Sequence, residues 1–217
     1  MKLFRALTLL LGLLALPARV VAHQLDEYLQ ATLVDIEPGE IQLHINLTPG
    51  VAVAQSVLGL IDRDRNGVIS TNETAAYAEM LKRDLVVRLD RRNVELKLAA
   101  LNFPEPSELR TGWGVIQLEY SVTPGALARG PHQLSLENRH LPTVSVYLFN
   151  AGQPKSPAIQ ILGQKRNKIQ STGEITFDFH PTPKPFNTGG IVVSLASLFF
   201  VFGACVWQTR KKTKAGL

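Results

Sequence analysis

Residues 62–73 have the side chains and the spacing of a calcium-binding loop. Calcium prefers about six to eight oxygen ligands, which a loop of this length supplies from positions 1, 3, 5, 7, 9 and 12. In this chain those positions hold Asp62, Asp64, Asn66, Val68, Ser70 and Glu73. Val68 has to contribute only its backbone carbonyl, Ser70 ligates directly or through water, and Glu73 supplies both carboxylate oxygens. The segment therefore predicts a Ca²⁺ site.

The residues around the loop complete an EF-hand pattern. Gly67 stands at loop position 6, where a positive φ lets the chain turn sharply. Apolar residues at helical spacing flank the loop: Val53, Val57, Leu60 and Ile61 before it, and Ala76, Tyr77, Met80, Leu81 and Leu85 after it. We therefore expect a helix–loop–helix at about residues 51–85. The alternative is a polar turn in which Ser70 and Glu73 form a capping box, and the two interpretations are compatible because the exiting helix starts there.

The N-terminus has the features of a signal peptide over residues 1–22. Lys2 and Arg5 form a basic region, and residues 6–16 form an apolar stretch too short to span a bilayer. Small residues precede a cleavage point after Ala22, which would make His23 the first residue of the mature chain. We expect the protein to be exported.

The C-terminus predicts a membrane anchor. Residues 189–207 carry no charge and are long enough for a transmembrane helix, and a basic tail at 208–217 follows. The positive-inside rule places this tail in the cytoplasm. The expected location is therefore the cell membrane, with a single span and the main domain in the periplasm or outside the cell. A sorting signal that is cleaved during surface anchoring is the alternative for this end. Alternating prolines at 181–188 predict a stiff linker.

The charge of the exported part differs from that of the whole chain, which is +5. Of the 23 Lys and Arg residues, three lie in the signal peptide and four in the tail, which leaves 16 against 18 acidic residues. This balance of about −2 argues against nucleic-acid binding. The only cysteine, Cys205, lies in the membrane segment, so the exported domain has no disulfide. An apolar core has to hold it together.

Residues 23–180 alternate apolar and polar side chains in short runs, as expected for antiparallel sheets with one wet face. We predict strands at 28–36, 41–47, 85–89, 94–98, 115–122, 133–138, 144–149, 158–162 and 174–179. Turn residues at 38–39 predict a hairpin between the first two strands, and 90–93 a second hairpin. The fold class expected is a mainly β, antiparallel, Ig-like β-sandwich with the EF-hand inserted between strands two and three.

Three segments carry a family resemblance: residues 22–30, the Leu47-Thr48-Pro49-Gly50 stretch and residues 145–151. They resemble bacterial exported EF-hand proteins of unassigned function. The domain is also similar, more weakly, to the periplasmic region of nickel permease-like proteins of the hydrogenase and urease accessory family. The resemblance covers residues 22–180 and implies a fold, an exported location and a protein partner such as a membrane permease. The single predicted span differs from the helical bundle of those permeases.

A second metal site is the alternative hypothesis. An N-terminal histidine offers its amine and its imidazole to one ion, so His23 could bind copper or nickel in an accessory protein of transition-metal transport. The candidate partners are His44, His132, His140 and His180. We find no catalytic constellation and expect no enzymatic activity. Trp113 between two glycines is expected to be a buried corner aromatic, or else a platform for a sugar or peptide.

Together these patterns predict a calcium-binding, membrane-tethered module whose ion is mainly structural.

Overall fold

The computed structural model describes residues 26–181. The predicted signal peptide, His23, all of the linker except Pro181, the membrane segment and the basic tail lie outside these residues. No helix between residues 26 and 181 combines the length and the apolar character needed to cross a bilayer.

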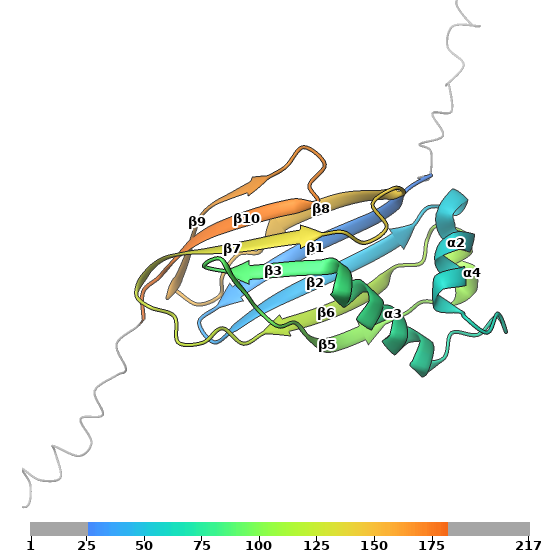
Figure 1. The fold of residues 1–217 in the computed structure, drawn as a ribbon, viewed down its shortest axis with the longest axis horizontal. Coiled ribbons are helices and arrows are strands. Elements are labelled where there is room, and N and C mark those ends of the chain that lie inside the picture. The colour runs from blue at the N-terminus through green and yellow to red at the C-terminus, as the bar shows by residue number, and fades with distance from the viewer. Residues whose placement is uncertain (1–25, 182–217) are drawn as a thin grey trace, which may run out of the picture. The chain divides into compact units, whose positions relative to one another are not determined.

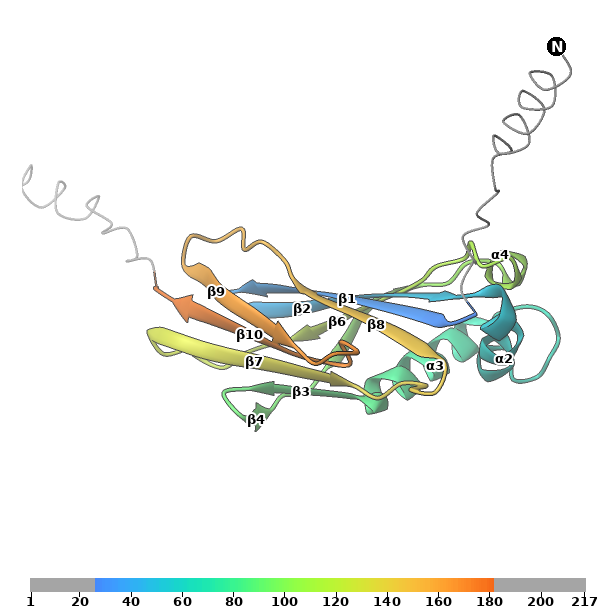
Figure 2. The ribbon, with the colours of Figure 1, turned by 90° about the horizontal axis from the view of Figure 1, so that it is seen from above.

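The described residues form two five-stranded sheets (Figure 1), as the mainly β prediction requires. Sheet A has the order β5-β6-β2-β1-β8 and contains Lys97–Asn102, Ile116–Val122, Glu40–Pro49, Tyr28–Glu37 and Ser145–Ala151. Sheet B has the order β4-β3-β7-β10-β9 and contains Arg92–Asn93, Leu85–Leu89, Gly130–Asn138, Thr172–Phe179 and Ile159–Arg166. Figure 2 shows β1 and β2 in one layer and β3 and β7 in the other.

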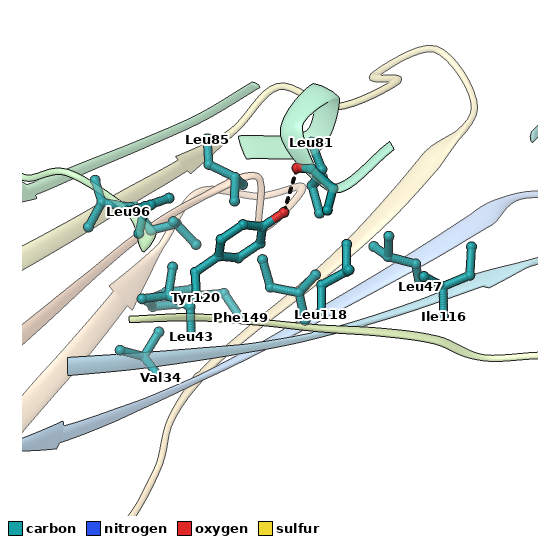
Figure 3. Packing of buried hydrophobic residues seen from close by; sticks show 14 of the residues in the cluster. Val34, Leu43, Leu47, Leu81, Leu85, Leu96, Ile116, Leu118, Tyr120 and Phe149 are labelled. Atoms are coloured by element: carbon teal, nitrogen blue, oxygen red, sulfur yellow. Dashed lines mark hydrogen bonds between the residues drawn. The ribbon is translucent and has the colours of Figure 1, made fainter. Parts of the chain in front are cut away.

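The apolar face of each sheet turns inward. Along β1 and β2 every second residue is buried, which matches the alternation in the sequence. The core combines residues from both sheets, including Leu43, Leu118 and Tyr120 from sheet A and Leu85 from sheet B (Figure 3). The hydroxyl of buried Tyr120 donates to the Ala78 carbonyl at 2.7 Å, so its polar end is satisfied.

The predicted hairpin of the first two strands is confirmed, with β1 and β2 antiparallel from Tyr28–Pro49 to Glu37–Glu40. The prediction of a wholly antiparallel fold is wrong at one place, because β1 and β8 are parallel. Residues from 38 to 144 separate these strands, so the connection between them is long enough to allow a parallel pair. Local alternation in the sequence carries no information about this pairing.

The strand predicted at 94–98 matches the structure only at residues 97 and 98, where β5 begins. Asp90 and Arg91 form a tight turn with φ of 49° and 68°, after which only Arg92–Asn93 pairs with β3. The chain then leaves sheet B, and β5 pairs with β6 in sheet A. The turn contains none of the glycines that usually mark this geometry, which is why the sequence placed the second strand too late.

Helices α2 (Val51–Ile61) and α3 (Thr71–Asp84) lie between β2 and β3, where the helix–loop–helix was predicted. A further short helix, α4 (Pro106–Arg110), was not predicted and packs near α2 (Figure 1). Its start combines a proline in the first turn with a capping box of Glu105 and Glu108. Those signals were readable in the sequence.

Among the four edge strands, β8 has unusual protection. Three of these strands have features that hinder pairing with another chain. β4 has only two residues, whereas β5 and β9 each contain a pairing irregularity and charged side chains. β8 contains neither charge nor proline. Instead, the side-chain oxygen of Gln164 accepts from the Ala151 N–H at 2.9 Å, and that of Gln170 from the Phe149 N–H at 3.5 Å. Side chains from β9 and from the β9–β10 turn thus accept from two backbone N–H groups of this edge.

His132 lies near the start of β7 and contacts two neighbouring loops. Its Nδ1 lies 2.7 Å from Asp90 Oδ2, and its Nε2 lies 2.7 Å from the Ala128 carbonyl. Both partners are acceptors, so only the imidazolium donates to both. Burial alone would lower the pKa of His132, but the hydrogen bonds to Ala128 and Asp90 outweigh it and raise the pKa.

This pair predicts a pH-dependent stability. Because the pKa of His132 is higher in the folded than in the unfolded chain, its hydrogen bonds stabilise the fold fully when the pH is below the unfolded pKa of about 6.5. This stabilisation is lost as the pH rises through the folded pKa. We expect His132→Gln to lower the melting temperature more at pH 6 than at pH 8.5. Thermal unfolding of both proteins at the two pH values measures this. An equal loss at both would show that the imidazolium is not needed.

Candidate calcium site

The loop from Asp62 to Ser70 brings three predicted ligands together. One carboxylate oxygen each from Asp62, Asp64 and Glu73 can be chosen so that all lie within 4.8 Å of one another. Asp62 caps the C-terminus of α2, Asp64 lies in the loop, and Glu73 lies in the first turn of α3. Loop positions 1, 3 and 12 therefore converge as the spacing predicted.

The backbone wraps around the Asp62 carboxylate. Gly67 has φ of +82°, which allows its N–H to donate to Asp62 Oδ2 at 3.0 Å. The Asn66 N–H donates to Asp62 Oδ1 at 3.1 Å and to Asp64 Oδ1 at 3.1 Å. These donors hold both carboxylates toward the inside of the loop. A carboxylate oxygen has further lone pairs, so the same oxygens remain able to ligate a cation.

Asn66, at loop position 5, is held by its own neighbours. Its amide nitrogen donates to Asp64 Oδ2 at 2.8 Å, and its amide oxygen accepts from the Val68 N–H at 2.7 Å. The amide oxygen keeps a second lone pair, which suits a hard cation. The side chain of Val68 is 65% exposed, in agreement with a position that needs only a backbone carbonyl.

Glu73 closes the loop at its other end. Its Oε1 accepts from the Arg63 N–H at 2.8 Å, and its Oε2 accepts from the N–H and the hydroxyl of Ser70 at 2.9 and 2.8 Å. Ser70 in turn accepts from the Glu73 N–H, so the predicted capping box is confirmed. The hydrogen bonds from Ser70, first of all from its backbone, lower the pKa of Glu73 and favour the charged form.

Ile69, at loop position 8, packs against the hydrophobic core. The core that it packs against combines residues of both sheets with residues of α2 and α3. Ile69 is therefore partly covered within this chain.

The sequence of the chain matches no protein-family model and no curated protein.

The histidines named for a second metal site are dispersed and engaged. His140 is 1% exposed, and its ring nitrogens contact Tyr77 and Asp84. His44 lies 3.3 Å from Asp35 and 3.4 Å from Glu119 on the outer face of sheet A. His132 is bound as described above, and His180 lies 3.1 Å from Asp178. His23 is outside the described residues, so the copper or nickel site remains a prediction.

Two features were missed or misread in the sequence. Trp113 is 74% exposed, so the expected buried corner aromatic is wrong. A Cβ on Gly114 would lie 2.8 Å from the Leu109 nitrogen, so the loop backbone packs closely against α4 at this point.

A buried polar cluster around His140 was also missed in the sequence. Gln30 and Thr32 lie on the same strand face as Tyr28 and Val34, and this was the available signal.

Two glycines offer a matched test of the loop. A side chain on Gly67 or on Gly59 would meet no atom within 4 Å, but only Gly67 has a positive φ. We expect Gly67→Ala to destabilise the protein by about 1–2 kcal/mol because of the left-handed backbone. Gly59→Ala, in helix α2, should stabilise it by about 0.5–1 kcal/mol. Urea unfolding measures both, and equal effects would contradict the loop geometry.

Proposed function

We propose that the chain is a calcium-binding, exported module tethered to the membrane, and that its ion is mainly structural. The observation that carries the proposal is the convergence of three carboxylates at EF-hand positions 1, 3 and 12. Asn66, the Val68 carbonyl and Ser70 complete an all-oxygen donor set. Such a set suits a hard dication far better than copper or nickel, which favour imidazole and amine.

The charges of the loop support a divalent ion. Asp62, Asp64 and Glu73 together carry a formal charge of −3, and carboxylates this close repel one another. Calcium would offset that repulsion and order the connection between α2 and α3. Extracellular sites of this kind bind at about 10⁻⁴ to 10⁻³ M. Outside the cell, calcium at or above that range would occupy half or more of the sites.

The role we propose for the whole domain is recognition or assembly. An Ig-like sandwich that displays its loops from a membrane stalk suits a binding or accessory module. Two sheets around one core, with the helices α2 and α3 and their acidic loop between β2 and β3, support this description. A partner such as a membrane permease would come from the resemblance alone. No residue of the described part suggests a reaction.

Calcium titration tests the central claim. We expect one-site binding by calorimetry and a higher melting temperature with calcium, because a ligand that binds only the folded state stabilises it. Glu73→Gln should weaken binding by at least about tenfold, because it removes a charged ligand at position 12.

Glu79→Gln is the matched control, because Glu79 lies on the same helix but pairs with Lys82 on the exposed face. It should bind calcium like the wild type. If Glu73→Gln binds and melts like the wild type with calcium, the loop is a polar turn and the proposal fails.

The two ends of the chain need a separate test. We expect mass spectrometry of the protein from cells to show a chain that starts at His23 and retains residues 189–217. A chain lacking 189–217 should be released from membranes. A mature protein already cut near Gly190 would instead favour the sorting-signal alternative.

A further inference from the structure

A buried row of hydrogen bonds ties helix α3 to the sandwich. The Tyr28 and Tyr77 hydroxyls are 2.7 Å apart, the Tyr77 hydroxyl is 3.0 Å from His140 Nε2, and His140 Nδ1 is 2.7 Å from Asp84 Oδ2. Tyr28 belongs to β1, Tyr77 and Asp84 belong to α3, and His140 belongs to the β7–β8 connection. The row therefore joins one helix to both sheets.

One arrangement of protons satisfies every member of the row. Burial lowers the pKa of His140 and raises the pKa of Tyr77 and of Tyr28 well above the ordinary tyrosine value, so the imidazole is neutral and both hydroxyls keep their protons. Tyr28 then donates to the Tyr77 oxygen, Tyr77 donates to Nε2, and Nδ1–H donates to Asp84. Each buried polar atom in the row is thus paired.

The backbone around His140 is fixed as well. Its carbonyl accepts from Gln30 Nε2 at 2.9 Å and from the Tyr147 hydroxyl at 2.9 Å, and its N–H donates to Asn138 Oδ1 at 2.9 Å. The Asp84 carbonyl accepts from the Arg139 N–H at 2.9 Å. The β7–β8 connection and the end of α3 are therefore held as one unit.

Helix α2 is attached differently. Its buried residues are Val53, Ala54, Val57, Leu58 and Ile61, and no side chain of α2 makes a hydrogen bond within the described residues. Apolar contacts are non-directional and tolerate small shifts. Of the two helices that flank the loop, α3 is the one with a directional attachment to the sandwich.

Glu73 and this attachment lie on the same side of α3. Glu73, Tyr77 and Asp84 are spaced by four and seven residues, which returns the chain to nearly the same face. Tyr77 is one turn from the predicted calcium ligand. A restrained first turn holds the Glu73 carboxylate near Asp62 and Asp64 before an ion arrives, and preorganisation of this kind raises affinity.

We propose that Tyr77 is a positioning residue for the calcium loop, and that the Tyr28–Tyr77–His140–Asp84 row couples calcium affinity to the order of the β7–β8 connection. The inference rests on the proposed calcium function. Coupling between two sites is reciprocal, so calcium should in turn stabilise residues 139–144.

The test compares two tyrosines on the full-length chain in detergent. Tyr77→Phe removes the central hydroxyl. Tyr147→Phe is the matched control, because it removes a similarly buried hydroxyl but leaves the Tyr28–Tyr77–His140–Asp84 row intact. Gln30 and Ser145 still donate to the His140 carbonyl in that variant, so the β7–β8 connection should stay ordered. Both should lower the melting temperature. Calorimetry should show calcium affinity about fivefold weaker for Tyr77→Phe, the equivalent of one buried hydrogen bond, and within about twofold of wild type for Tyr147→Phe.

Hydrogen exchange provides the readout that general destabilisation does not change. In the wild type, calcium should slow amide exchange across residues 139–144, and Tyr77→Phe should abolish that difference. If Tyr77→Phe does not fold, Tyr28→Phe removes the same bond from the β1 side and carries the same expectation.

The outcomes separate the two claims. Equal calcium affinities for the two variants, or unchanged exchange at 139–144 in calcium-bound wild type, would overturn the positioning role and leave calcium binding intact. A wild-type protein that does not bind calcium would overturn both.

Discussion

Asp84 and Leu85 join helix α3 to strand β3 without an intervening residue. This junction constrains the rest of the molecule, because the direction of the helix is set by a strand that already lies in sheet B. Tyr77 and Tyr120 then hold the helix from the side of sheet A, through Tyr28 and the Ala78 carbonyl. The position of α3 is therefore determined by both layers of the sandwich. The loop before it has to form between this fixed helix and α2, which the core holds only by apolar packing.

The loop itself opposes three like charges with backbone donors. N–H groups of Arg63, Asn66, Gly67 and Ser70 point at the carboxylates of Asp62, Asp64 and Glu73. Backbone dipoles reduce the repulsion but carry no net charge. A cation would complete the balance, and oxygen donors on one short segment would favour a hard one. The same loop is therefore compatible with a folded chain and with a filled site.

Several features encoded by neighbouring residues were predicted, although the short helix α4 was missed. The β1–β2 hairpin follows from alternation and from Gly39, and the loop follows from side chains at fixed positions within one short segment. Features that depend on distant partners were not. The parallel pairing of β8 with β1, the transfer of β5 to sheet A and the row centred on Tyr77 and His140 each join segments far apart in the sequence. Trp113 was misread because the surrounding glycines permit either an inward or an outward indole.

The glutamine side chains that cover β8 have a consequence for folding. An open strand edge can pair with other chains that have not finished folding. Lysine or proline would protect this edge from the moment of synthesis, whereas Gln164 and Gln170 protect it only after β9 and β10 have reached their places. Until then the Ser145–Ala151 edge is expected to be open to pairing with another chain. Protection of this edge is therefore expected to arrive with the β9–β10 hairpin.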